Sequence, residues 1–122
     1  MYVLDTNVII YFLKGDEGVK NILMEAFFAA PIFVSSVTEI ELLAYPRLTA
    51  EEETTINSFL NGCVLVPVDS RVARLAAVLK RDYGLGLADS IIAATAATTH
   101  STLATRNITD FKKVANLKLK KV

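Results

Sequence analysis

Short runs of β-branched and aromatic residues alternate along the chain with longer segments of helical periodicity, and this alternation constrains the fold more than any other feature. Strands separated by helices pair in a parallel sheet that is covered by helices on both faces. The sequence therefore predicts an α/β fold. The expected strands are Val3 to Asp5, Ile32 to Val34, Val64 to Val68, Thr102 to Thr105 and, weakly, Leu117 to Lys120.

The segments between these runs have apolar residues three and four positions apart, which is the spacing of amphipathic helices. Thr49 and the acids that follow it open one helix, because a hydroxyl cap and first-turn carboxylates satisfy free backbone amides. The segment from Ala88 to Thr99 is almost wholly apolar and is expected to be internal. The expected helices cover residues 8–14, 19–30, a segment that includes 39–43, 49–61, 70–84 and 88–99, with a turn or short helix at 107–111.

The composition restricts the class of protein. The chain has 122 residues, which suits one domain with a core of its own, and 52% of them are apolar. Formal net charge is zero, so no global basic field attracts nucleic acid and any such binding must depend on local groups. The single cysteine, Cys63, excludes an internal disulfide. Without a signal peptide or a membrane-spanning segment, we expect a soluble, cytoplasmic protein.

Polar residues stand where two of the predicted strands end. Asp5 closes the first strand, and Arg106, Asn107 and Asp110 follow the strand that ends at Thr105. Ligands of parallel α/β sheets bind beyond the carboxyl ends of the strands. If these two strands are neighbours, their polar residues meet at one rim of the sheet.

Acidic residues occupy four places where packing alone would not require them. Carboxylates that converge from distant positions repel one another, and a divalent cation is the usual remedy. Oxygen ligands without a cluster of histidine or cysteine favour Mg²⁺ or Mn²⁺ over zinc. The four places are Asp5, the pair Glu39 and Glu41, Asp89 and Asp110.

Each acid also has a purely structural interpretation. Asp89 and Asp110 are each suited to cap a helix, and Asp5 is suited to an Asx-turn with the residues that follow it. Glu39 and Glu41 lie about 200° apart around a helix, so at most one of them faces a site squarely.

Other catalytic arrangements have little support. The chain has one histidine, His100, so it offers no credible Ser/His/Asp or Cys/His pairing. No P-loop is present either.

Four sequence blocks, in this order, resemble those of PIN-domain proteins and in particular the VapC-type toxins of toxin–antitoxin pairs. They extend from Tyr2 to Phe111, so the resemblance implies that residues 1–122 are a single PIN domain. It also implies a three-layer α/β/α fold with a short, mainly parallel central sheet. The blocks are VLDTNVIIYFLKG, VSSVTEIELLAYP, LGLADSIIAATA and STLATRNITDF.

The resemblance implies a Mg²⁺- or Mn²⁺-dependent endoribonuclease that hydrolyses RNA phosphodiester bonds with an activated water. Its catalytic and metal-binding acids are Asp5, Glu41, Asp89 and Asp110. Some relatives carry an aspartate at the position of Asn107, whereas in this chain the acid comes three residues later, as Asp110. Supporting roles fall to Thr6, Asn7, Thr105 and Asn107, and Arg106 is expected to contact an RNA phosphate.

The resemblance also implies partners: an RNA substrate, a VapB-type antitoxin and a second copy in a homodimer, with no role for a membrane. An antitoxin segment would lie in a groove and block the acids. Six apolar residues suit either such a partner or the core: Phe12, Phe27, Phe28, Leu42, Leu43 and Tyr45.

Three alternatives remain at this point. A housekeeping PIN nuclease that processes or degrades RNA would use the same residues. A catalytically inactive PIN-like binding module is less consistent with the retained acids. A phosphatase of the haloacid dehalogenase type usually needs a second aspartate at the place occupied here by Asn7.

Overall fold

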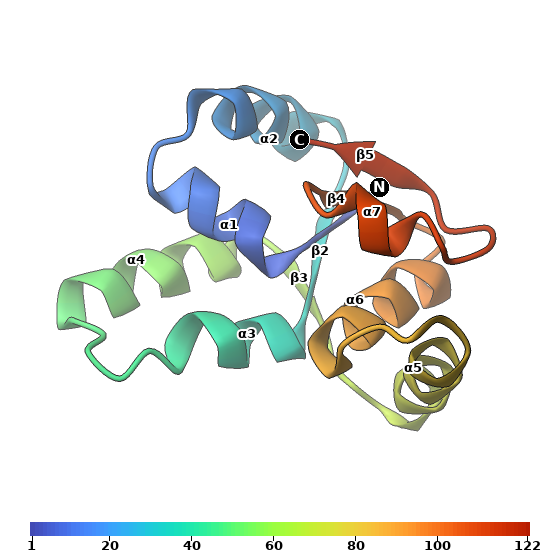
Figure 1. The fold of residues 1–122 in the computed structure, drawn as a ribbon. Helices are drawn as coiled ribbons and strands as arrows, with labels where there is room; N and C mark the ends of the chain where they lie inside the picture. Colours follow the sequence, from blue (N-terminus) through green and yellow to red (C-terminus); the bar gives the residue numbers. More distant parts are fainter.

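The computed structural model describes residues 1–122 and contains one five-stranded sheet with helices on both of its faces (Figure 1). The strands follow one another in the order β3-β2-β1-β4-β5. Their bounds are Tyr2–Leu4 for β1, Ile32–Ser35 for β2, Val64–Val66 for β3, Thr102–Thr105 for β4 and Leu119–Lys121 for β5. The helices are α1 (Thr6–Leu13), α2 (Glu17–Ala29), α3 (Ser36–Leu43), α4 (Ala50–Asn61), α5 (Ser70–Tyr83), α6 (Leu87–Thr98) and α7 (Ile108–Phe111).

The central strand is β1, although it is the first in the chain. It pairs in parallel with β2 on one side and with β4 on the other, so Tyr2 lies opposite both Ile32 and Thr102. The two outer pairings are also parallel. The predicted α/β class is confirmed, and the sheet is parallel throughout.

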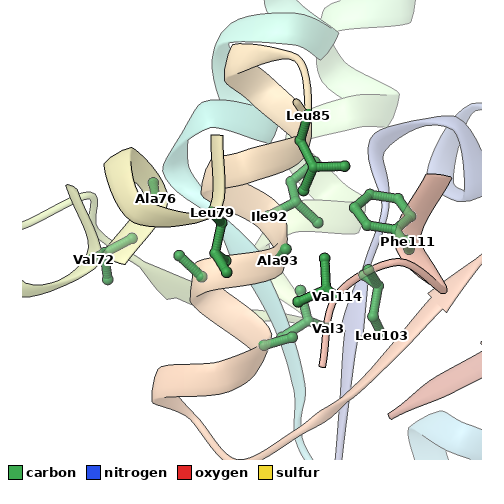
Figure 2. Close-up of a cluster of buried hydrophobic side chains, with 12 residues drawn as sticks. Val3, Val72, Ala76, Leu79, Leu85, Ile92, Ala93, Leu103, Phe111 and Val114 are labelled. Carbon is green, nitrogen blue, oxygen red and sulfur yellow. The ribbon is translucent and has the colours of Figure 1, made fainter. Parts of the chain in front are cut away.

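Two apolar cores lie on the two faces of the sheet. Successive residues of a strand point to opposite faces, and accordingly Val3 and Leu103 belong to one core whereas Leu4 and Ala104 belong to the other. Helices α5, α6 and α7 cover the first face, where Phe111 packs near Leu103 (Figure 2). Helices α1 to α4 cover the second face. The fold therefore has the three predicted layers.

Local sequence explains where several helices begin and end. Thr49 and Glu52 form the expected capping box at the start of α4, each side chain bonding the other's backbone amide. Helix α5 ends at Gly84, whose φ of 68° lies in the left-handed region that glycine adopts without steric cost.

Several predicted boundaries differ from the structure by one or two residues, among them those of β3, α1 and β5. Strand β3 ends before Pro67, because proline has no amide hydrogen to donate to the ladder. Helix α1 begins at Thr6, so the chain enters the helix directly after Asp5. The last strand begins at Leu119 rather than Leu117.

No helix in the structure is both long enough and apolar enough to cross a membrane.

The buried strand β4 provides a test of the packing. Leu103 is fully buried, so the change Leu103→Ala would remove its apolar contacts and leave a cavity, lowering the free energy of unfolding by about 2–5 kcal/mol. The matched control is Leu65→Ala in edge strand β3, where the side chain is 40% exposed, and its effect should be below about 1.5 kcal/mol. Urea unfolding measures both values, and equal losses would contradict the placement of β4 in the sheet.

Candidate active site

The end of β1 meets the end of β4, and this junction forms the centre of the candidate site. Asp5 is the first residue after β1, and its backbone amide donates to the carbonyl of Ala104 over 3.0 Å. Its carboxylate accepts a 2.8 Å hydrogen bond from the hydroxyl of Thr105, the last residue of β4. Both residues are buried. Neighbouring strands therefore bring together two side chains that lie 100 positions apart in the chain.

Thr105 also begins a second chain of contacts, which reaches Asp110. The hydroxyl of Thr105 accepts a 2.9 Å hydrogen bond from the backbone amide of Asn107. The side-chain amide of Asn107 then donates to a carboxylate oxygen of Asp110 over 3.0 Å. Asn107 and Asp110 are thus joined, and Asn107 orients the acid that follows it.

Glu41 reaches the site through Thr6. The Thr6 hydroxyl donates to Glu41 Oε1 over 2.7 Å and lies 2.9 Å from the hydroxyl of Thr38. Because Thr6 has one hydroxyl hydrogen and gives it to Glu41, Thr38 must be the donor of the second bond. Two hydrogen bonds therefore connect Glu41 through Thr6 to Thr38, which is fully buried, and they hold the Glu41 side chain in position.

Asp89 is the fourth acid, and it lies in the first turn of α6. Burial, together with the negative charges of Asp5, Asp110 and Glu41, raises its pKa to about 6. The same four acids that the sequence singles out therefore share one electrostatic environment. Unlike the other three, Asp89 accepts no hydrogen bond from a side chain.

Burial likewise raises the pKa of Asp5. The hydrogen bond from Thr105 opposes this shift, as do the backbone amides of Thr6 and Asn7, whereas the charge of Glu41 adds to it. Two neighbouring carboxyl groups thus both resist ionisation, which is common where acids are gathered for catalysis or metal binding.

The structural interpretations of these acids fit less well. Gly86, not Asp89, is the N-cap residue of α6, and Asp5 precedes α1 without forming a side-chain cap. Asn107 rather than Asp110 occupies the N-cap position of α7. Capping therefore accounts for neither Asp89 nor Asp110, whereas the backbone amides of Thr6 and Asn7 that act on the Asp5 carboxylate agree with its Asx-turn interpretation.

Two of the remaining predicted residues contribute little through their side chains. Glu39 is absent from the charges that shift Asp5 and Asp89, whereas Glu41 acts on both. Asn7 is exposed, and only its backbone amide affects Asp5. The structure thus brings Glu41, not Glu39, to the rim.

The chemistry of the donor set suits a hard divalent cation, because every side chain at the rim offers oxygen. The carboxylates lie farther apart, however, than the ligands of one bound ion would. No three histidine, cysteine, aspartate or glutamate side chains are gathered closely enough to hold an ion as they stand. The residues therefore fit Mg²⁺ or Mn²⁺ in type, and a bound ion would draw the carboxylates together or reach some of them through water.

Arg106 is directed to other partners than the four acids. Its guanidinium donates to Asp16 Oδ2 and to the backbone carbonyl of Val122, each over 2.9 Å. It also lies 4.4 Å from the centre of the Tyr11 ring. The predicted phosphate-binding group is thus already occupied by contacts within the protein.

The sequence analysis missed two participants. Thr38 is not among the predicted site residues, but its hydroxyl bonds Thr6 while Ser35 caps α3. Its place in the block VSSVTEIE, three residues before Glu41 and so on a neighbouring part of the same helix face, is the signal that identifies it. Asp16, the partner of Arg106, has no comparable signal because the two lie 90 positions apart.

The raised pKa of Asp89 predicts a pH-dependent effect of Asp89→Asn. Between about pH 4 and pH 7 the native protein must ionise a carboxyl group that burial keeps protonated, so it loses stability relative to the variant as the pH rises through about 6. A shift of about two pKa units corresponds to about 3 kcal/mol, which partial exposure reduces to about 1 kcal/mol. Urea unfolding with a chelator present, at pH 4 and pH 7, measures this difference.

The variant should therefore be more stable than the native protein at pH 7 and close to it at pH 4. Glu39→Gln is the control, because Glu39 is not among the charges that act on Asp5 and Asp89, and it should not reproduce the stabilisation that Asp89→Asn gives at pH 7. A constant difference between native protein and Asp89→Asn at both pH values would contradict the assignment.

Comparisons with known proteins agree with this geometry. The family described as "PIN domain" matches residues 2–117. Ribonuclease VapC10 of Mycobacterium tuberculosis is 30% identical over 123 aligned positions, which cover 97% of this chain and 91% of that protein.

Solved structures show the same fold. A VapBC2 complex from Rickettsia felis, bound to a DNA fragment from its promoter, superposes with a TM-score of 0.88 at 24% identity and covers 99% of this chain and 98% of that one. A toxin–antitoxin complex from Klebsiella pneumoniae gives 0.83 at 25% identity, with 96% and 95% covered. From its extent and its relatives, the chain belongs to the PIN-domain family, and to the VapC-type proteins within it.

Proposed function

We propose that the protein is a Mg²⁺- or Mn²⁺-dependent endoribonuclease and the toxin of a VapBC-type pair. The observation that carries this proposal is the electrostatic coupling of four carboxylates at the carboxyl rim of the sheet, where three of them raise the pKa of Asp89. The curated ribonuclease relative and the toxin–antitoxin complexes among the structural neighbours support the same function.

Asp5, Glu41, Asp89 and Asp110 would hold the cation, directly or through water. When bound, such an ion lowers the pKa of water and neutralises charge that develops on a phosphodiester. The protein's own hydrogen bonds orient the ligands: Thr105 holds Asp5 by a 2.8 Å bond and Thr6 holds Glu41 by a 2.7 Å bond.

Asp89 is the group best suited to accept a proton from the attacking water. Its pKa is about 6 in the metal-free protein, and a bound cation would lower that pKa and so favour the carboxylate form, which is the form that accepts a proton. It is also free of side-chain donors that would compete for its oxygens. Attack of water on phosphorus breaks the P–O3′ bond, so the products carry a 5′-phosphate and a 3′-hydroxyl.

Substitutions of the acids test this function directly. Asp5→Asn and Asp89→Asn remove a negative charge and a ligand oxygen, so the rate of RNA cleavage with Mg²⁺ or Mn²⁺ should fall by about 100-fold or more. Cleavage is measured on a purified mixture of long RNAs, with the ends of the products mapped by sequencing.

Glu39→Gln provides the matched control, because it removes an acid from the same helix as Glu41 but outside the coupled group. Its rate should stay within about twofold of the native rate. Equal activity of the native protein and both aspartate variants would refute the proposed site, and the absence of any metal-dependent cleavage would refute the nuclease.

An apolar groove beside the site supports the proposed antitoxin partner. The groove measures about 460 Å³ and lies between α1, α3 and α4, the first two of which carry Thr6 and Glu41. Its lining is mainly apolar, and Tyr45 at its edge is 57% exposed. The residues that line it are Ile10, Leu13, Lys14, Leu42, Tyr45, Leu48, Glu51, Glu52, Thr55 and Ile56.

This partner assignment predicts a separation of toxicity from neutralisation. Tyr45→Arg places a charge in the groove, so an antitoxin encoded beside the gene should no longer rescue growth, while the chain remains toxic when expressed alone. Phe28→Arg is the control, because Phe28 is 86% exposed and lies outside the groove. Growth after induced expression, with and without the antitoxin, measures both effects.

Rescue of Tyr45→Arg as complete as rescue of the native chain would contradict the assignment of the groove. In the same proposal the protein acts in the cytoplasm as a homodimer. Analytical ultracentrifugation of the purified chain measures the oligomeric state.

A further inference from the structure

Arg106 lies in the chain between the two residues that connect Asp5 to Asp110. Thr105 before it donates to Asp5, and the amide of Asn107 after it donates back to the hydroxyl of Thr105. Arg106 and Asn107 form the irregular connection between β4, which ends at Thr105, and α7. The conformation of this connection therefore determines where two of the four carboxylates lie.

The Arg106 side chain anchors this connection to distant parts of the molecule. Its guanidinium forms an ion pair with Asp16 at 2.9 Å and covers the ring of Tyr11 in α1 at 4.4 Å. Its Nε donates to the carbonyl of Val122 over 2.9 Å. These contacts engage Nε, Nη2 and one face of the guanidinium, so they restrict its orientation.

Val122 strengthens the anchor from the other side. Its backbone amide donates to the carbonyl of Thr105 over 3.3 Å, while its own carbonyl accepts from Arg106. Val122, which follows β5, is thus bonded to both Thr105 and Arg106.

Asp16 is itself held in place. It is the N-cap residue of α2, and its Oδ1 accepts from the backbone amide of Val19 over 3.1 Å, leaving Oδ2 for Arg106. Those two hydrogen bonds lower its pKa, the bond from Val19 most strongly, so it remains a carboxylate. The connection is therefore tied to the rigid start of a 13-residue helix.

We propose that Arg106 is a positioning residue, held by Asp16, that orients Asp5 and Asp110 through Thr105 and Asn107 and does not contact the RNA. The proposal rests on the nuclease function above. It replaces the role that the sequence suggested, in which the guanidinium binds a substrate phosphate.

The two roles make opposite predictions for Asp16. If Arg106 positions the connection, loss of the Asp16 carboxylate loosens the site and slows catalysis. If Arg106 binds phosphate, Asp16 competes with the substrate, so its loss frees the guanidinium and tightens RNA binding.

Asp16→Asn is the decisive variant, because asparagine caps helices as well as aspartate does and so preserves the start of α2. We expect kcat for RNA cleavage to fall about tenfold with KM within twofold of the native value. Amide hydrogen exchange at Asn107, followed by NMR on the metal-free protein, should become at least fivefold faster. Arg106→Ala should show the same changes, and Arg106→Lys should recover part of kcat because it restores the charge opposite Asp16.

Asp82→Asn is the matched control. It breaks the exposed ion pair between Arg81 and Asp82, which has a similar distance of 3.3 Å but lies at the end of α5. Neither kcat nor exchange at Asn107 should change. A general loss of stability would raise exchange at many amides, whereas a positioning defect is confined to the connection between β4 and α7.

A lower KM with unchanged kcat in Asp16→Asn would overturn the proposal in favour of phosphate binding. Unchanged kinetics together with unchanged exchange would overturn it as well. If the native chain cleaves no RNA, the nuclease function fails by itself, and exchange at Asn107 in Asp16→Asn then decides whether Arg106 holds the connection.

Discussion

The hydrogen bond between Thr105 and Asp5 is the contact on which the rest of the site depends. It exists because β1 is the central strand and β4 is its direct neighbour, so the two strands end at the same rim. Thr105 is also hydrogen-bonded to Asn107, which in turn bonds Asp110. Thr6, which follows Asp5 in the chain, bonds Glu41. The apolar cores on both faces of the sheet hold β1 and β4 in place, and so fix the positions of the residues at the ends of these strands.

Asp89 differs from the other three acids in its hydrogen bonding. A side-chain donor fixes one oxygen of Asp5, Glu41 and Asp110, whereas Asp89 has no such donor, and burial and the three neighbouring carboxylates raise its pKa to about 6. A hydrogen bond to a carboxylate favours its ionised form, and burial without one favours the protonated form. The lack of a side-chain donor thus sets Asp89 apart from the other three acids that would hold the cation.

Much of this arrangement is readable from the sequence, because it depends on local patterns. The alternation of strands and helices predicts a parallel sheet, and Asp5 directly after the first strand predicts a residue at its rim. Glu39 and Glu41 are separated by helical geometry, and the structure places Glu41 at the rim as expected. The partners of Arg106 are not readable in this way, because Asp16, Tyr11 and Val122 reach it only through packing between distant segments.

The central place of β1 has a consequence for synthesis of the chain. Asp5 is synthesised well before its partner strand β4 (Thr102–Thr105), and α6 must also be in place to supply Asp89. Contacts between such distant positions form late, because the intervening chain must be ordered first. A nascent chain that stops short of β4 has the first carboxylate but no rim to hold it, so the site cannot assemble before β4 has been translated.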